Sequence, residues 1–140
     1  MEYCNGRFSL KTTLIIANQL IDRIEWIHSK NLVYNDIDAN NFLVGLGKKA
    51  DKIFVVDFGN CRKFVDGDDN HYFIGNEVDL IKNNIRFRSI HCHIGKSNFF
   101  NYKETSRRDD LESLGYLLVY FLKGSLPWDT LEGDEDELSV

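Results

Sequence analysis

Helical spacing of apolar residues marks two segments of the chain. After Ser9, apolar residues recur every three or four positions, at Leu10, Leu14, Ala17, Leu20, Ile21, Ile24 and Ile27. This spacing predicts an amphipathic helix with Ser9 as its N-cap. Ser106-Arg107-Arg108-Asp109 resembles a capping box, and residues from about 110 to 122 are apolar on every side of a helix. The second pattern predicts a helix buried in the core.

Short β-prone segments lie between the two predicted helices. Residues 32–34 form one strand candidate. Residues 42–44 and 53–56 flank a connection that contains Gly45 and Gly47, which predicts a hairpin. Residues 60–105 are polar and aperiodic, which predicts a long loop. The order of helix, hairpin, loop and helix indicates an α+β fold.

Composition and charge narrow the class of protein. The chain has 140 residues, 43% hydrophobic and 28% charged, as expected of a soluble domain. Its longest apolar run, residues 114–122, is far shorter than the roughly 20 residues of a membrane span. The net charge of −5 reflects six acidic residues within 129–140, so the remainder is nearly neutral. We therefore expect neither nucleic-acid binding nor membrane binding.

Cysteine usage and the N-terminal residues indicate a compartment. Cys4, Cys61 and Cys92 are an odd number at irregular spacing, and no apolar leader segment is seen at the N-terminus. We expect an intracellular protein of the cytoplasm, the nucleus or both.

Three polar residues follow the predicted strands in a pattern with chemical meaning. Asp36 and Asn41 are five residues apart in a polar loop, and Asp57-Phe58-Gly59 follows the second hairpin strand. Protein kinases use D-x-x-x-x-N followed by D-F-G in this order. The first Asp accepts a proton from the substrate hydroxyl, and the Asn and second Asp supply oxygen atoms to Mg²⁺.

The chain resembles the casein kinase I family of serine/threonine protein kinases from about Gly6 to Trp128. The string Arg107-Arg108-Asp109-Asp110-Leu111-Glu112-Ser113-Leu114-Gly115-Tyr116 is the most specific part of the resemblance. Further matching segments are Phe8-Ser9-Leu10-Lys11-Thr12, Ile27-His28-Ser29-Lys30-Asn31, Asn41-Phe42-Leu43, Gly45-Leu46-Gly47-Lys48-Lys49, Asp57-Phe58-Gly59 and Gly124-Ser125-Leu126-Pro127-Trp128.

The resemblance implies a fold, site residues and ligands. Residues 1–128 would form the first half of a helical kinase large lobe, and residues 129–140 an acidic tail. Asp36 would be the catalytic base, and Asn41 and Asp57 would bind Mg²⁺ and ATP. Asp110 would brace the catalytic loop through hydrogen bonds to its backbone. The partner would be a protein substrate that is phosphorylated on Ser or Thr.

The sequence departs from the family at positions that matter for catalysis. The family's His-Arg-Asp-x-Lys-Pro-x-Asn is here Tyr34-Asn35-Asp36-Ile37-Asp38-Ala39-Asn40-Asn41. Asp38 stands where a lysine would meet the transferring phosphate, so repulsion replaces attraction. No glycine-rich loop or strand lysine precedes Ser9, so we expect the ATP-binding small lobe to be absent. These departures predict weak or no phosphotransfer, and they leave open whether the chain is an enzyme.

Two other functions remain open. The chain could be a non-catalytic, pseudokinase-type interaction module that binds an acidic or phosphorylated protein, or a gene fragment without a function of its own. The basic residues available to such a module are Lys82, Arg86, Arg88, Lys96, Arg107 and Arg108, although charge runs are more often solvated surface. The sequence does not determine an oligomeric state.

Overall fold

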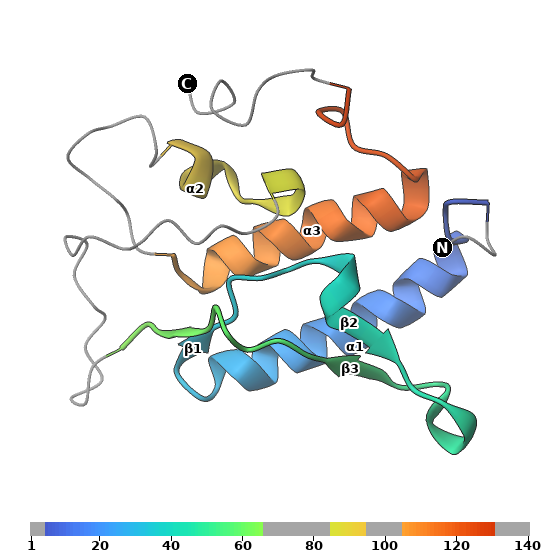
Figure 1. Ribbon diagram of the computed structural model, residues 1–140, viewed down its shortest axis with the longest axis horizontal. Coiled ribbons are helices and arrows are strands. Elements are labelled where there is room, and N and C mark those ends of the chain that lie inside the picture. Colours follow the sequence, from blue (N-terminus) through green and yellow to red (C-terminus); the bar gives the residue numbers. More distant parts are fainter. Residues whose placement is uncertain (1–4, 66–84, 95–104, 131–140) are drawn as a thin grey trace.

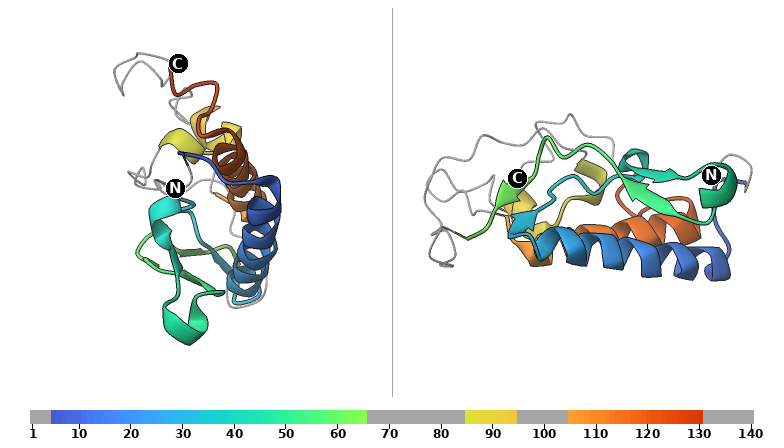
Figure 2. Two further views of the ribbon diagram at one scale, coloured as in Figure 1. Left: turned by 90° about the vertical axis from the view of Figure 1, so that its right-hand side faces the viewer. Right: turned by 90° about the horizontal axis from the view of Figure 1, so that it is seen from below.

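Two long helices organise the chain. The computed structural model describes residues 5–65, 85–94 and 105–130, which form an α+β arrangement. Helices α1 (Leu10–His28) and α3 (Arg107–Lys123) run side by side, and the short strands and helix α2 (Ile90–Ile94) lie on one side of the pair (Figure 1 and Figure 2). No helix within these described ranges is long and apolar enough to cross a membrane.

The strands form two small antiparallel sheets. Strand β1 (Leu32–Val33) pairs with β4 (Arg62–Lys63), and β2 (Phe42–Val44) pairs with β3 (Ile53–Val55). The β2–β3 pair confirms the predicted hairpin, while β1 ends one residue before the predicted end at Tyr34. Single 3₁₀ turns occupy Ala39–Asn41, Gly47–Lys49 and Ile85–Phe87.

Helix α1 begins as predicted and buries only part of the predicted apolar stripe. The backbone N–H of Thr12 donates to the Ser9 hydroxyl at 3.2 Å, which confirms the N-cap. The buried side chains of α1 are Thr13, Leu20, Ile24 and Ile27. Leu10, Leu14 and Ile21 of the predicted stripe are exposed. The stripe was wider than the face that α3 and the strands cover, so only part of it enters the core.

Helix α3 starts earlier than the sequence pattern indicated. The Asp109 carboxylate accepts the N–H of Ser106 at 2.8 Å, which is one half of a capping box, and also accepts the Ser106 hydroxyl at 3.0 Å. The helix ends at Gly124, whose φ of +81° lies in the left-handed region that glycine adopts without strain.

Burial of α3 on every side was predicted and is wrong within the described part of the chain. Leu114, Leu117 and Phe121 are buried, but the side chain of Val119 is 43% exposed. Helix α1 and the Ile85–Phe87 turn both contact α3, and neither covers the position of Val119.

The long loop predicted over residues 60–105 contains regular structure where it is described. Strand β4, the Ile85–Phe87 turn and α2 all lie inside it, and residues 66–84 and 95–104 lie outside the described ranges. Short elements of two to five residues carry too few apolar positions to reveal a period in the sequence.

One hydrophobic core joins the two long helices to the strands. Its buried residues are Leu20, Ile24, Ile27, Tyr34, Ile37, Ile53, Phe87, Leu114, Leu117, Phe121 and Leu126. The segment before α1 is attached at the far end of α3, where the Phe8 N–H donates to the Phe121 carbonyl at 2.7 Å and their rings pack edge to face. The paired helices therefore form a support on which the loop after β1 rests.

Candidate active site

The carboxylate of Asp110 fixes the loop that carries Asp36. One of its oxygens accepts the backbone N–H of Tyr34 at 2.8 Å, and the other accepts that of Asn35 at 2.8 Å. The Nε2 atom of His28, at the end of α1, lies 2.7 Å from the same carboxylate. Asp110 is 2% exposed, so these groups replace the water it gives up on folding. The backbone contact expected of Asp110 is confirmed.

Tyr34 connects this loop to the segment after β3. Its hydroxyl donates to the carbonyl of Val56 at 2.5 Å, and its ring packs edge to face against Phe58 with 5.7 Å between centroids. Burial and nearby carboxylates raise the pKa of Tyr34 far above its usual value. The hydroxyl therefore stays protonated and keeps its role as a donor.

Asn41 brings the loop and the hairpin together. Its side-chain amide donates to the backbone carbonyl of Asp36 at 3.0 Å. The backbone carbonyl of Asn41 accepts the N–H of Val56 at 3.0 Å, which extends the β2–β3 pairing by one residue pair. Asn41 therefore lies beside Asp36 and directly across from the residue that precedes Asp57.

Asp57 has an unusual backbone conformation. Its φ of +57° lies in the left-handed region, which costs energy for a residue other than glycine. Its side chain is exposed and accepts the N–H of Gly59 at 3.2 Å, which stabilises the turn locally.

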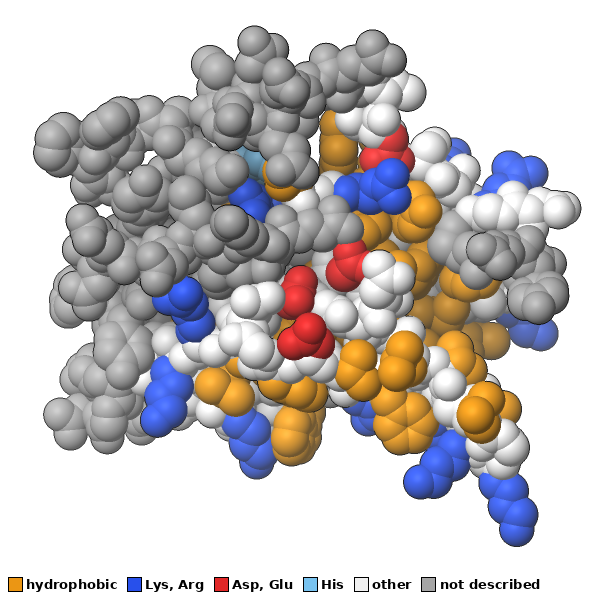
Figure 3. Space-filling view, in the orientation of Figure 1, with side chains coloured by type: hydrophobic (Ala, Val, Ile, Leu, Met, Phe, Trp, Pro, Cys, Tyr) orange, Lys and Arg blue, Asp and Glu red, His pale blue; other side chains and the backbone are white. Residues whose placement is uncertain are grey.

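Burial and nearby charges change the acidity of Asp36. Burial raises the pKa of Asp36 above its ordinary value, the amides of Asn60 and Asn41 oppose this, and the charges of Asp57 and Asp38 raise it further. Figure 3 shows acidic side chains gathered near the middle of one face, with basic side chains mostly toward its edge. A carboxyl group whose pKa is raised accepts a proton more readily at neutral pH.

Asp38, which stands at the position of the family's lysine, is buried and bonded within the loop. It is 7% exposed, and its carboxylate accepts the N–H of Asn40 at 2.8 Å, capping the Ala39–Asn41 turn. Its charge nevertheless raises the pKa of Asp36, so it acts electrostatically on the site. The sequence predicted the added negative charge but not its local structural role.

The donor atoms of this site suit a hard divalent cation. The amide nitrogen of Asn41 is used by Asp36, which leaves its oxygen, and Asp57 supplies an exposed carboxylate. Mg²⁺ is held in proteins by one or two such oxygens together with water and phosphate. Within the described ranges, no three His, Cys, Asp or Glu side chains gather to hold a metal ion. Water molecules and phosphate oxygens would therefore supply most of the ligands of a cation bound here.

Sequence reasoning missed two partners of the site. Asn60 donates its amide to the carboxylate of Asp36 at 3.0 Å, and His28 pairs with Asp110 across 82 positions of sequence. Neither residue has a distinctive spacing relative to its partner, so no pattern in one sequence would reveal the contact. Asn60 does stand directly after Gly59 of the Asp-Phe-Gly segment, which is the one local clue.

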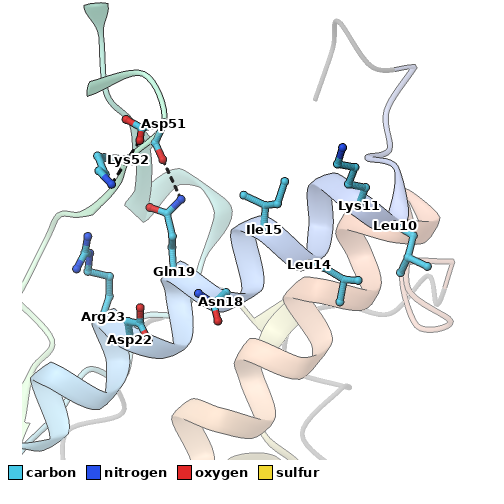
Figure 4. A pocket seen from close by; sticks show the side chains of 10 residues that line it. All are labelled: Leu10, Lys11, Leu14, Ile15, Asn18, Gln19, Asp22, Arg23, Asp51 and Lys52. Atoms are coloured by element: carbon cyan, nitrogen blue, oxygen red, sulfur yellow. Dashed lines mark hydrogen bonds and ion pairs between the residues drawn. The ribbon is translucent and has the colours of Figure 1, made fainter. Parts of the chain in front are cut away.

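A groove lies apart from these residues, along the exposed side of α1. Figure 4 shows Gln19 reaching from α1 to the carbonyl of Asp51, next to an ion pair between Asp51 and Lys52. The groove is lined by Leu10, Lys11, Leu14, Ile15, Asn18, Gln19, Asp22, Arg23, Asp51 and Lys52. Asp36, Asn41 and Asp57 are not among them, so the acidic site and the groove are separate.

The fold and site define an α+β protein in which an acidic loop is braced by a buried helix carboxylate. A scan against models of known protein families finds none that matches this chain.

Proposed function

We propose that this chain carries part of the large lobe of a casein kinase I-like serine/threonine protein kinase and transfers phosphate weakly or not at all. Asp36 takes the position of the catalytic base, and Asn41 and Asp57 take the positions that hold Mg²⁺ with ATP. The substrate class is a hydroxyl group on a protein Ser or Thr.

The observation that carries the proposal is the pair of hydrogen bonds from the loop backbone to Asp110. A carboxylate 2% exposed accepts the N–H groups of Tyr34 and Asn35, which immediately precede Asp36. Asn41 then holds the carbonyl of Asp36 itself. These contacts fix the backbone on both sides of Asp36, which is the preorganisation that a positioned general base needs.

Each residue of the site has a definite task in the proposed chemistry. Asp36 orients the substrate hydroxyl and accepts its proton, and its raised pKa favours that acceptance. Asn41 and Asp57 supply oxygen ligands, and Mg²⁺ when bound neutralises negative charge on the phosphates. Tyr34 holds the segment before Asp57 through the carbonyl of Val56.

The charges around Asp36 account for the weak transfer. Asp38 takes the place of a lysine that would attract the transferring phosphate, and its charge acts on Asp36. A unit charge at 4 Å contributes roughly 1 to 4 kcal/mol between the dielectric of water and that of a protein surface, so reversing its sign costs about twice that. Such a cost, about 2 to 8 kcal/mol, corresponds to a loss of roughly thirtyfold or more in rate.

The phosphoprotein-binding alternative receives less support from the described residues. Arg86 pairs with Asp129 at 2.9 Å and lies over the Tyr120 ring, and Arg107 lies over the Phe64 ring. These cations already make contacts within the fold, which favours the kinase-derived hypothesis. Lys82 and Lys96 of the same basic cluster lie outside the described ranges.

Cation binding tests the proposal directly. Mn²⁺, a paramagnetic substitute for Mg²⁺, is added with ATP to the ¹⁵N-labelled chain, and the broadening of each backbone amide signal is measured. We expect broadening to centre on Asn41 and Asp57 and to be lost in Asp57→Asn, because a carboxylate ligand is removed. Asp51→Asn is the matched control, since Asp51 is exposed and outside the site.

Two results would count against the proposal. Broadening that is spread over the surface, or that Asp57→Asn leaves intact, would remove the assigned cation site. Incubation with Mg²⁺, ATP and casein gives the second readout, in which we expect incorporation too low for Asp36→Asn to change it measurably. Strong Mg²⁺-dependent phosphorylation of casein that Asp36→Asn abolishes would overturn the weak-transfer part.

A further inference from the structure

Hydrogen bonds of Asn60 join the loop of Asp36 to the segment after β3. Its side-chain amide donates to the Oδ2 atom of Asp36 at 3.0 Å. Its backbone carbonyl accepts the side-chain amide of Asn35 at 3.1 Å. Asn60 therefore holds the loop at the residue before Asp36 and at the Asp36 carboxylate itself.

The Asp36 carboxylate is bonded to the neutral amide of Asn60, and the nearby charged groups, Asp38 and Asp57, are negative. Within the described part of the chain it makes no ion pair with lysine or arginine, and its Oδ2 atom accepts the neutral amide of Asn60. Asp57 and Asp38 are close enough to act on it electrostatically. A carboxylate in these surroundings is attracted by any divalent cation nearby, so the Asn60 bond competes with the cation for it.

The position of Asn60 suits such a competition. Asn60 follows Asp57-Phe58-Gly59, so its amide is anchored three residues from one proposed cation ligand. Asn41, the other proposed ligand, already donates to the backbone of Asp36. Asp36 thus lies beside Asn41 and within electrostatic range of Asp57, and one of its carboxylate oxygens is bonded to Asn60.

We propose that Asn60 is a positioning residue that holds the Asp36 carboxylate against the segment after β3 and withholds it from a divalent cation held by Asn41 and Asp57. This inference rests on the proposed function, because it concerns the same cation site. Mg²⁺ accepts one or two protein carboxylates, so a freed Asp36 becomes a second carboxylate ligand alongside Asp57.

Mn²⁺ affinity measured by amide broadening tests this role. Asn60→Ala removes the donor, and we expect Mn²⁺ to bind roughly tenfold more tightly, because a hydrogen bond to a charged acceptor no longer competes. Asn40→Ala is the matched control, since Asn40 is exposed and its bond to Asp38 uses only its backbone N–H. Adding Asp36→Asn to Asn60→Ala should reverse the gain.

A second measurement examines the hydrogen bond without any cation. A double-mutant cycle of Asp36→Ala and Asn60→Ala, followed by urea unfolding, should give a favourable coupling between the two side chains. A coupling near zero would overturn the inference whatever Mn²⁺ does.

The outcomes separate this inference from the proposed function. Broadening at Asn41 and Asp57 that is equal or weaker in Asn60→Ala removes the role of Asn60 and leaves the cation site standing. Localised Mn²⁺ binding that is seen in Asn60→Ala and not in the unsubstituted protein supports the inference, because the Asn60 bond then prevents detectable binding. Absence of localised broadening in both proteins removes the cation site and the inference together.

Discussion

At the scale of single residues, Asp110 determines the geometry of the site. It accepts the N–H groups of Tyr34 and Asn35 and contacts His28, although these residues are 75 to 82 positions away in sequence. A buried carboxylate is costly without partners, and buried N–H groups are costly without acceptors. Each group satisfies the other, so the loop is held where the long helices meet.

Asp110→Ala should therefore destabilise the protein strongly. Removing the carboxylate leaves two backbone N–H groups and His28 without their acceptor, and we expect a loss of roughly 3 to 5 kcal/mol in the free energy of unfolding. Urea denaturation followed by circular dichroism measures it. Asp51→Ala, at a side chain 70% exposed, should change stability by less than about 0.5 kcal/mol. Equal effects of the two substitutions would refute the bracing role.

At the scale of elements, α1 covers the outer edge of the hairpin with side chains. Gln19 donates to the carbonyl of Asp51 at 2.9 Å and accepts the N–H of Ile53 at 3.0 Å. Arg23 donates to the carbonyl of Ile53 at 3.2 Å. These groups occupy the hydrogen-bonding positions that a third strand would take, so α1 holds β3 in place without a larger sheet.

Gln19→Ala should loosen this junction. Two hydrogen bonds are lost, and we expect a loss of about 1 to 2 kcal/mol in stability and faster hydrogen exchange of the Ile53 amide. Exchange measured by NMR provides the site-specific readout. Asn18→Ala is the control on the same helix, because Asn18 is exposed. Unchanged exchange at Ile53 in Gln19→Ala would show that β3 does not depend on α1.

Helix and hairpin positions were predictable because their signals are local. The Ser9 and Ser106 caps and the glycine-containing hairpin connection depend on neighbours within a few residues, and all are present in the structure. Burial was less predictable, because Leu14 and Val119 have the right residue type but are exposed in the described part of the chain. Periodicity identifies an apolar face, and tertiary packing selects which part of it is covered.

At the scale of the whole molecule, the fold retains protons on several buried or half-buried groups. Burial raises the pKa of Cys61 to about 11, and nearby carboxylates add to the effect. Tyr116, bonded to Glu112, has its pKa raised to about 12, and the pKa of Tyr34 is raised further. The folded protein therefore prefers the neutral form of each group.

Stability should consequently fall at alkaline pH. The unfolded chain releases the Cys61 proton near pH 9 while the folded chain still holds it, so the stabilising effect is complete below that pH and is lost as pH rises toward 11. Urea unfolding at pH 8 and pH 10.5 measures the loss, which Cys61→Ala should reduce. A stability difference between the two proteins that stays constant across this range would contradict the prediction.

The sequence by itself determined the helices, their caps, the hairpin and the order of Asp36, Asn41 and Asp57, because these depend on local spacing and residue type. Only the tertiary structure decided that Asp110 meets the loop before Asp36 and that Asn60 meets the Asp36 carboxylate. Such contacts join residues 24 to 76 positions apart, and nothing local specifies them. They form because burying a carboxylate or a backbone N–H requires a partner, and the packing of α1 against α3 determines which partner is within reach.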